Sequence, residues 1–276
     1  MKIILSRKGF DSSAGGYPSL ILKDGTLLSL PIPDEDSTVH YHHLKKENTS
    51  YYDLMHLIKG KIKNGNKWSK LHKHTSCHLD PDLDGNIMER KKGWRGIFGQ
   101  SGGAQRHLEN QKVEIGDLFL FFGWFRKTIQ DGKRISFDPK DRNGKHILYG
   151  YLQVGDILKV DPSTKVPDWM VEHPHCTPLK RGRKGNTVYL ARRHLTWNES
   201  FPGYGTFKFE EKLVLTKDDM NKSCWDLPEC FRYVPISYHK PENWKDDHFQ
   251  SVARGQEFVV HASEEVIQWA KQIISP

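Results

Sequence analysis

The stretch IILSRKGFDSSAGGYPS, residues 3–19, decides how the rest of the chain is interpreted. It begins with Ile3-Ile4-Leu5, an apolar run of the length expected for a buried strand. A strand that ends in a polar, glycine-rich loop places charged side chains at the mouth of a fold, where ligands bind. Spacing alone equally allows a strand, a solvated turn and a second strand. The polar residues that follow the strand are Arg7, Lys8, Asp11, Ser12, Ser13, Gly15 and Gly16.

The composition favours a globular protein with a polyanionic partner. The 276 residues are long enough to bury a core, and no repeat or low-complexity linker divides them, so we expect a single domain over residues 1–276. Lysine and arginine exceed aspartate and glutamate by 42 − 34 = 8. Such a surplus favours nucleic acid, because cationic side chains neutralise phosphates and release counterions. A basic surface that serves only solubility is the alternative.

Cysteine usage and hydropathy predict the compartment. The four cysteines, Cys77, Cys176, Cys224 and Cys230, contain no CxxC pair. The chain opens directly on the first strand, without a signal-like segment, and no apolar run approaches the length of a membrane span. We therefore expect reduced thiols in a cytoplasmic protein that has no contact with a membrane.

Hydrophobic periodicity predicts more strands than helices. Helices are expected from Ser50 to Ile62 and from Ser263 to Ile274, and a short one at Asp168–Val171. This balance indicates an α+β fold with a mixed or barrel-like sheet and a few packing helices, one of them C-terminal. Strands are expected at 3–30 (two or three short ones), 118–125, 146–152, 157–160, 187–191 and 207–215.

The segment Cys77–Gly85 carries alternating carboxylates. In an extended loop, Asp80 and Asp82 would point the same way, beside His78. A helix-loop-helix calcium site is excluded, because the twelfth position counted from Asp80 is Lys91. General acid–base chemistry remains open here, with a plain Asp-Pro turn as the alternative.

Basic and aromatic residues alternate between Glu89 and His107. Lys91, Lys92 and Arg95 surround Trp94, an arrangement that suits nucleic acid because cations hold the backbone while a ring stacks on a base. The run Ser101–Ala104 before Gln105 and His107 resembles a helix N-terminus that offers N–H groups to a phosphate, although it lacks a P-loop ending. An ordinary basic surface loop is the alternative.

Two later clusters are candidates for ligand contacts. His173, His175 and Cys176 could join Cys77 and His78 around a metal, but the spacing matches no structural zinc pattern, so we expect no metal. A flexible basic loop offers the best candidates for phosphate contacts, with solvated charge as the alternative: Lys180, Arg181, Arg183 and Lys184.

The motifs of the chain resemble the third of the nucleotide-modification-associated domain families. The resemblance implies association with systems that make, read or attack modified bases in DNA, largely in phage and bacterial conflict. The order of elements from Gly116 to Val154 is also similar to the PUA, ASCH and EVE group of small β-barrels, which commonly hold RNA or a modified base, and this similarity implies a PUA-like sheet. The motifs are residues 6–16, 78–83, 102–108, 116–125, 146–150 and 173–175.

The resemblance makes DNA carrying modified bases the expected partner. The leading hypothesis is a glycosylase that excises a hypermodified base, such as a glycosylated hydroxymethyl-pyrimidine, in anti-phage defence. Such an enzyme flips its target base into a pocket, where Phe10, Trp94 or Trp124 would stack on it. Ser12, Gly15 and Gly16 would line the substrate site, and His107 or Gln105 would contact the base, the latter at its edge.

Cleavage of an N-glycosidic bond places positive charge on the sugar and negative charge on the base. Asp11 is the first candidate for the carboxylate that stabilises the sugar, followed by Asp80 and Asp82. Arg7, Lys8 or a histidine, His78 or His107, would stabilise the departing base.

Two other functions remain open. A non-catalytic reader that holds a modified base in DNA or RNA would need the same basic and aromatic composition. A transferase would need a donor site, and no dinucleotide or nucleotide fingerprint is visible, so no cofactor is expected. Loss of turnover with retained DNA binding in Asp11→Asn and Asp80→Asn variants would distinguish an enzyme from a reader.

Overall fold

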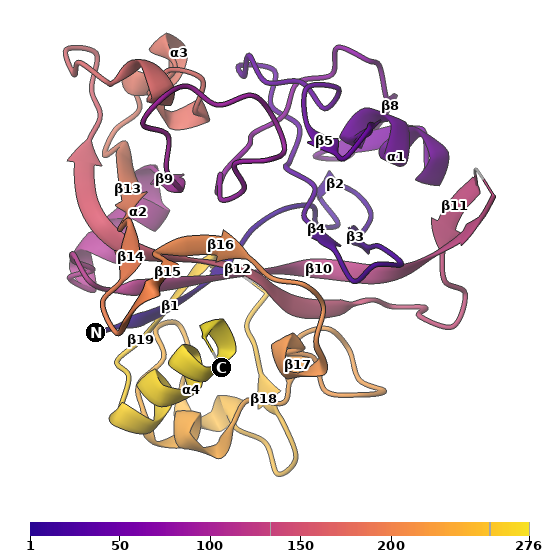
Figure 1. The fold of residues 1–276 in the computed structure, drawn as a ribbon. Helices are drawn as coiled ribbons and strands as arrows, with labels where there is room; N and C mark the ends of the chain where they lie inside the picture. The colour runs from indigo at the N-terminus through magenta and orange to yellow at the C-terminus, as the bar shows by residue number, and fades with distance from the viewer. Residues whose placement is uncertain (133, 254, 276) are drawn as a thin grey trace.

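The fold is organised around a mixed β-sheet (Figure 1). The computed structural model describes residues 1–132, 134–253 and 255–275. The main path of the sheet runs in the order β19, β1, β10, β12, β13, β9. The strands β1 and β10 are parallel, whereas β10, β12, β13 and β9 pair in antiparallel fashion. Their bounds are β1 Ile3–Arg7, β9 Ile97–Gln100, β10 Leu118–Asp131, β12 Lys145–Lys159, β13 Thr187–Ala191 and β19 Glu257–Val260.

The long strand β10 has two successive partners on one edge. β1 pairs with Leu118–Phe122, and β3 (Ser19–Ile21) pairs with Phe125–Lys127, both in parallel. The chain between β1 and β3 therefore leaves the sheet and returns to it a few residues further along β10. Other short strands extend the sheet into a curled half-barrel: β4 (Leu27–Leu28) on β3, β11 (Arg134–Phe137) on β10 and β16 (Tyr204–Thr206) on β12.

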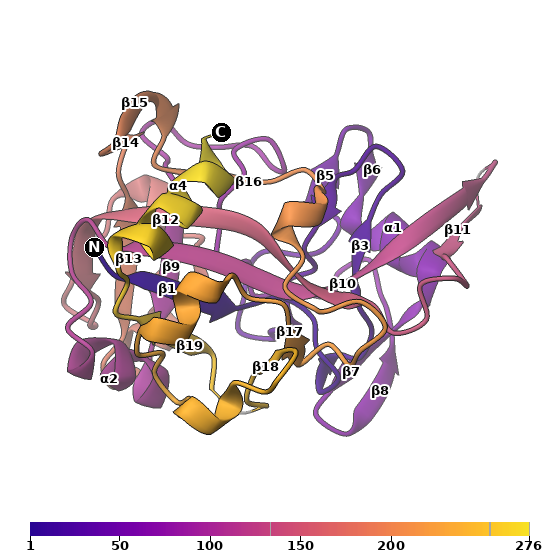
Figure 2. The ribbon, with the colours of Figure 1, turned by 90° about the horizontal axis from the view of Figure 1, so that it is seen from below.

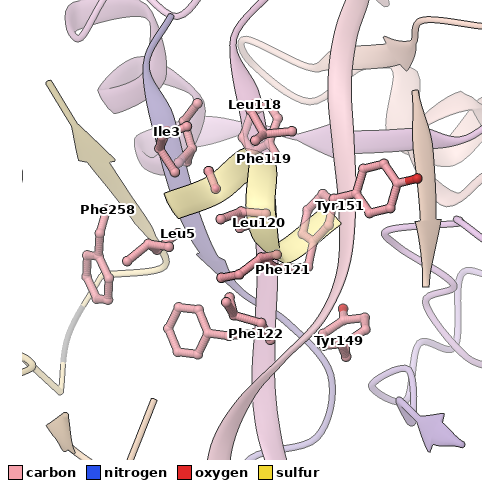
Figure 3. Packing of buried hydrophobic residues seen from close by; sticks show 14 of the residues in the cluster. Ile3, Leu5, Leu118, Phe119, Leu120, Phe121, Phe122, Tyr149, Tyr151 and Phe258 are labelled. Carbon is pink, nitrogen blue, oxygen red and sulfur yellow. The ribbon is translucent and has the colours of Figure 1, made fainter. Parts of the chain in front are cut away.

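The C-terminal segment covers one face of this sheet. The helix α4 (Glu264–Ile274) lies across β10 and β12 in Figure 2, with the Ser263 side chain capping its first turn. Its buried residues Val266, Ala270 and Ile273 join the main hydrophobic core. Figure 3 shows the centre of that core, where apolar side chains of β1 and β10 meet Phe258 and the tyrosines of β12. These residues are buried on both sides, which explains why Leu118–Phe122 is an uninterrupted apolar run.

The N-terminal third packs on the opposite side of the sheet from α4 (Figure 1). Its helix α1 (Tyr51–Ile58) begins at the capping box of Ser50 and Asp53 and ends before Gly60, whose φ is +61°. The predicted helix to Ile62 is therefore too long, because the chain turns at Gly60 into a strand. A second core cluster forms here around Phe10, Tyr41 and Met55. Its small strands are β2 Ala14–Gly15, β5 Lys45–Lys46, β6 Thr49–Ser50, β7 Lys61–Asn64 and β8 Lys67–Lys70.

The remaining described elements are short. The helix α2 (Gly102–Asn110) follows β9, and α3 (Pro178–Arg181) lies before β13. Four short strands form two-stranded pairs: β14 His194–Leu195 with β15 Asn198–Pro202, and β17 Cys224–Trp225 with β18 Phe249–Gln250. The 3-10 helices are η1 Asp168–Met170, η2 Pro174–Cys176, η3 Glu211–Leu213, η4 Glu229–Tyr233 and η5 Pro241–Asn243.

The structure confirms the α+β fold with a mixed, barrel-like sheet and a C-terminal helix. Two strand predictions were wrong in detail. Residues 146–152 and 157–160 belong to one continuous strand, β12. The segment 207–215 forms only isolated bridges to neighbouring strands and turns and contains η3, because its backbone bonds alternate between β12 and the turn at Gly25.

The described residues also allow the expectations about membrane spans and cysteines to be examined. None of their helices combines the length and the apolar character that a membrane crossing requires. Cys77, Cys176, Cys224 and Cys230 are all free thiols within the described chain.

Candidate active site

A cavity of about 440 Å³ lies where the loop after β1 meets the ends of β9 and α3. This volume falls within the range of small-molecule sites, roughly 300–1,000 Å³. Its wall combines charged residues from parts of the chain that are far apart in sequence. The charged and aromatic residues that line it are Arg7, Lys8, Phe10, Asp11, Asp34, His78, Asp80, Trp124, His175, Lys180 and Arg183.

The loop that carries Asp11 leaves the sheet beside Gly123 of β10, where the two backbones lie close together. Lys8 N–H donates to Phe122 O at 2.9 Å, which is the last sheet-like bond before the chain turns away from β10. At Gly123 a Cβ atom would lie 2.8 Å from the Lys8 carbonyl oxygen. Glycine at that position therefore allows the two backbones to approach closely at the base of the loop.

The Asp11 carboxylate is held by its own loop. Its Oδ1 accepts bonds from Ser13 N–H at 2.6 Å, Ser13 Oγ at 2.7 Å and Ala14 N–H at 2.7 Å. Burial raises the pKa of Asp11, but these bonds and the Arg7 charge outweigh that effect, and the pKa stays below its ordinary value. The carboxylate is therefore ionised at neutral pH, and within the described residues its Oδ2 accepts no hydrogen bond.

The two basic residues next to Asp11 are anchored to the C-terminal segment. Arg7 donates through one terminal nitrogen to the carbonyl oxygens of Ala253 and Gly255. Lys8 Nζ lies 2.8 Å from Glu257 Oε1, and both side chains are almost fully buried. Gln100 Nε2 donates to the same Glu257 oxygen at 2.7 Å. Glu257, which was not among the predicted site residues, therefore neutralises the charge of Lys8.

Asp34 connects two further walls of the cavity. Its Oδ2 lies 2.8 Å from His78 Nδ1 and also accepts a bond from Lys180 Nζ. Burial raises the pKa of Asp34, but the bonds from His78 and Lys180 hold it well below its usual range. Asp34 was not among the predicted site residues, because it stands in an acidic stretch that is typical of a solvated loop.

Asp80 is buried at the floor of the cavity. Its Oδ1 accepts bonds from Gly99 N–H at 2.8 Å and from His173 Nε2 at 3.2 Å. Burial raises the pKa of Asp80, but the His173 bond and the neighbouring histidines hold it well below its ordinary value. Its second oxygen, Oδ2, lies 3.7 Å from His78 Nε2 and 3.7 Å from His175 Nε2. Both separations are too long for hydrogen bonds.

His175 is oriented by a buried amide. Its Nδ1 lies 2.6 Å from Asn186 Oδ1, so the Nδ1–H donates there and Nε2 faces Asp80. The ring fits because residue 99 is glycine, where a Cβ atom would come within 2.4 Å of it. Burial lowers the pKa of His175 to about 3, although Asp80 opposes this shift, and the ring is neutral at physiological pH.

Trp124 lies on the cavity wall at the sheet edge from which the loop departs. Its Nε1 donates to Asn143 O at 2.8 Å, and Lys222 Nζ stands 3.8 Å from the ring centroid. Burial lowers the pKa of Lys222, and Asp11 partly opposes the shift. The sequence identified Trp124 but not Lys222, because the two residues belong to segments nearly a hundred positions apart.

The structure removes several predicted residues from this cavity. Asp82 makes a two-point ion pair with Arg90, at 2.6 and 2.8 Å, and does not line the cavity, so it is not available for catalysis there. Trp94 packs edge-on against Tyr204 and lines other depressions. Lys91 and Lys92 are exposed outside the cavity, and Arg95 donates to Ala191 O.

Phe10, Gln105 and His107 are occupied by internal contacts. The Phe10 ring is 1% exposed and packs against Tyr17, so it cannot stack on a base in this conformation. Gln105 is 2% exposed and accepts a bond from Tyr189 Oη. His107 Nε2 bonds with Ser237 Oγ on the far side of α2. The last two do not line the cavity.

Ser12, Gly15 and Gly16 surround Asp11 rather than face the cavity. Ser12 is exposed, and its carbonyl oxygen accepts a bond from Lys63 Nζ. Gly15 and Gly16 have φ angles of +86° and +85°. A Cβ at Gly15 would overlap the Phe10 ring at 2.1 Å. The two glycines therefore serve to close the loop tightly around Asp11.

The predicted flexible basic loop is partly structured. Lys180 and Arg181 form the end of α3, and Lys180 is only 2% exposed because its ammonium group faces Asp34. A phosphate contact by Lys180 would require that pair to break. Arg181 donates to Cys176 O, whereas Arg183 and Lys184 are exposed, Arg183 at the rim of the cavity.

The comparison with known families identifies the chain. A family described as nucleotide modification associated domain 3 matches residues 2–261. The chain belongs to this family. The matched range includes every residue of the cavity wall named above, and it confirms the family expected from the motifs. Comparisons with curated proteins and with solved structures find no match. The nucleotide modification associated domain 3 assignment fits a role in a modified-base DNA system.

Proposed function

We propose that this nucleotide modification associated domain 3 protein hydrolyses the N-glycosidic bond of a modified base in DNA. The observation that carries the proposal is Asp11, an ionised carboxylate fixed by three hydrogen bonds on the wall of a cavity that has room for a base. The family, whose members are associated with nucleotide modification, supports the choice of substrate.

The chemistry requires a negative charge next to the sugar. As the bond between C1′ and the base nitrogen breaks, its electron pair leaves with the base and positive charge develops on the sugar ring. The Asp11 carboxylate stabilises that charge, while a water oxygen forms the new bond to C1′ and the proton lost by that water neutralises the departing base. Because the pKa of Asp11 is lowered, the carboxylate retains its charge in weakly acidic solution.

The leaving base carries the opposite charge. Arg7 and Arg183 supply positive charge on the cavity wall, and Trp124 offers an aromatic face at the same wall. Lys8 does not contribute net charge, because Glu257 neutralises it. Arg7 is the last residue of β1 and Asp11 lies in the loop that follows it, so a group for the sugar and a group for the base are held close together at the end of β1.

The experiment compares DNA that contains glycosylated hydroxymethyl-pyrimidines with unmodified DNA of the same sequence. Released base is measured by mass spectrometry and abasic sites by an aldehyde-reactive probe. We expect release from the modified DNA alone. Asp11→Asn should slow it by roughly 10²–10⁴-fold and leave DNA binding intact.

Asp161→Asn is the matched control. Asp161 also holds a serine two positions later, through Ser163 N–H at 2.8 Å and Ser163 Oγ at 2.6 Å, but it lies on an exposed loop outside the cavity. It should retain full activity. Tight binding of modified DNA without released base would contradict the proposal and favour the reader. Equal rates in Asp11→Asn and the wild type would remove Asp11 from the reaction.

A further inference from the structure

Three ligand atoms converge at the floor of the cavity. A ring nitrogen of His78, an Asp80 carboxylate oxygen and a ring nitrogen of His175 lie within 4.8 Å of one another, and all three residues line the cavity. The two separations from Asp80 Oδ2 to the Nε2 atoms are 3.7 Å. Ligand atoms around a tetrahedral zinc ion with bonds of about 2.1 Å lie about 3.4 Å apart. A small inward movement of the side chains would therefore complete such a geometry.

Each of these residues is supported through its other polar atom. His78 Nδ1 bonds with Asp34 Oδ2 at 2.8 Å, and His175 Nδ1 bonds with Asn186 Oδ1 at 2.6 Å. Donation from Nδ1 to Asn186 leaves the Nε2 lone pair of His175 directed at Asp80. His78 Nδ1 has two neighbours, Asp34 Oδ2 and the Lys180 ammonium at 3.2 Å, and donation to Asp34 leaves its Nε2 lone pair directed at Asp80 in the same way. The remaining oxygen, Asp80 Oδ1, accepts from Gly99 N–H and His173. Metal-binding histidines are typically oriented by a carboxylate or carbonyl oxygen in this way.

We propose that His78 Nε2, Asp80 Oδ2 and His175 Nε2 bind one divalent transition-metal ion, with an open coordination position facing the cavity. Two imidazoles and one carboxylate suit zinc and its first-row neighbours. His173 is not a ligand, because its Nε2 is directed at Asp80 Oδ1. Lys180 does not block the site, because its ammonium group is bound to Asp34 beside His78 Nδ1, the ring nitrogen that is not a proposed ligand.

The ion would supply the water for the proposed reaction, and this part of the inference rests on the proposed function. A metal-bound water has a pKa far below that of bulk water, so it can provide hydroxide near neutral pH. Its site opens into the same cavity that Asp11 lines. The ion would thus activate the nucleophile, and Asp11 would stabilise the sugar.

The test uses the full chain after treatment with a chelator. Zn²⁺ is titrated by calorimetry, and Co²⁺ is titrated while its visible absorption is recorded. We expect one ion per chain and the visible bands of Co²⁺ bound to nitrogen and oxygen ligands. His78→Gln and His175→Gln should each weaken binding by about a hundredfold or more, since loss of a supporting residue alone weakens metal affinity roughly 10–100-fold.

The triple variant His40→Gln, His42→Gln, His43→Gln is the control. These residues form another group of close histidines, but His43 is exposed and all three lie outside the cavity wall. The control should bind Zn²⁺ at the cavity as the wild type does. Near-UV circular dichroism checks that each variant is folded, and the wild-type stoichiometry is a readout that requires no variant.

Three outcomes would overturn the metal site. They are no stoichiometric ion on the wild type, unchanged affinity in folded His78→Gln and His175→Gln variants, or loss of binding in the control. The base-release assay separates this inference from the proposed function. Base release by a metal-free chain that binds no ion would reject the metal site alone, whereas stoichiometric binding without release would reject the glycosidic reaction alone.

Discussion

His78 Nδ1 lies 2.8 Å from Asp34 Oδ2, although the two residues are 44 positions apart in the chain. Lys180 donates to the same oxygen from a third segment. Asp34 therefore connects its own loop, the His78–Asp80 segment and α3 at one point of the cavity wall. The side chains of Asp34 and Lys180 are 11% and 3% exposed, so the pair is largely withdrawn from water.

Replacing Asp34 with asparagine should destabilise the protein strongly. The change leaves the buried Lys180 charge uncompensated, which costs about 3–5 kcal/mol in comparable buried pairs. The pKa of Asp34 is lowered in the folded state, so its contribution to the free energy of unfolding is complete above the unfolded value near 3.9 and declines as the pH falls below it. Urea unfolding at pH 7 and pH 3 would measure both effects.

Asp36→Asn is the control for that measurement, because Asp36 pairs with Arg183 at 3.7 Å and both side chains are about half exposed. It should cost less than about 1 kcal/mol. An equal loss in the two variants would show that the Asp34 pair is no stronger than a surface contact.

His146 should make stability depend on pH. Burial lowers its pKa to about 3 from an ordinary value of 6.5, with nearby Arg7 and Lys222 adding to the effect. Between these values the unfolded chain binds a proton that the folded protein does not. The His146 contribution to the free energy of unfolding therefore falls as the pH drops below 6.5, by about 1.4 kcal/mol per pH unit at most.

The His146→Gln variant should show a shallower decline than the wild type between pH 6.5 and pH 4, measured by chemical unfolding. The same substitution at the exposed His194 should leave the wild-type decline unchanged. Parallel curves for the wild type and His146→Gln would contradict the prediction.

Gly15→Ala should disrupt the Asp11 loop. The residue has φ +86°, and a Cβ atom would lie 2.1 Å from the Phe10 ring. Backbone strain and overpacking each cost about 1–3 kcal/mol, so we expect a loss of about 3 kcal/mol or more, measured by thermal or urea unfolding. Gly182→Ala is the control, since its φ is −75° and a Cβ there meets nothing within 4 Å. A Gly15→Ala variant as stable as Gly182→Ala would refute the packing argument.

DNA binding should depend on Arg183 and Lys184 more than on other exposed cations. Removing both should weaken binding and reduce the slope of log affinity against log salt concentration by about 1–2, because each phosphate contact contributes about 0.9. Fluorescence anisotropy over a salt series measures this slope. The matched pair Lys91→Ala, Lys92→Ala removes the same charge outside the cavity wall and should have the smaller effect. The reverse order would place the nucleic acid on the Trp94 side.

Local patterns predicted the elements that depend on neighbouring residues. The capping pair Ser50–Asp53 marked the start of α1, Ser263 marked α4, and the run Leu118–Phe125 marked β10. Segments 207–215 and 59–62 were predicted less well. The backbone hydrogen bonds of residues 207–215 go to distant partners, and the chain at residues 59–62 turns at a glycine. Periodicity carries no information about such partners.

The candidate site could be predicted only in part, because local sequence patterns do not reveal which distant segments come together. Residues near the β1 loop, Arg7 and Asp11, could be identified from a strand that ends in a polar loop, and they do line the cavity. Asp34 and Glu257 could not be identified in this way, because each contributes to the site only through an ion pair with a lysine from a remote segment. Asp82 was selected for its spacing from Asp80, yet the two carboxylates have different partners, Arg90 and His173.

The position of β1 between β10 and β19 has a consequence for biosynthesis. β1 pairs with two strands that lie much further along the chain and are therefore made much later, the second of them at Glu257–Val260. The anchors of Arg7 and Lys8 at Ala253, Gly255 and Glu257 form only when that segment has been translated. Pairings of such long range form slowly. A nascent chain that stops before Ala253 would therefore expose the Arg7 and Lys8 side chains of the cavity wall without their partners.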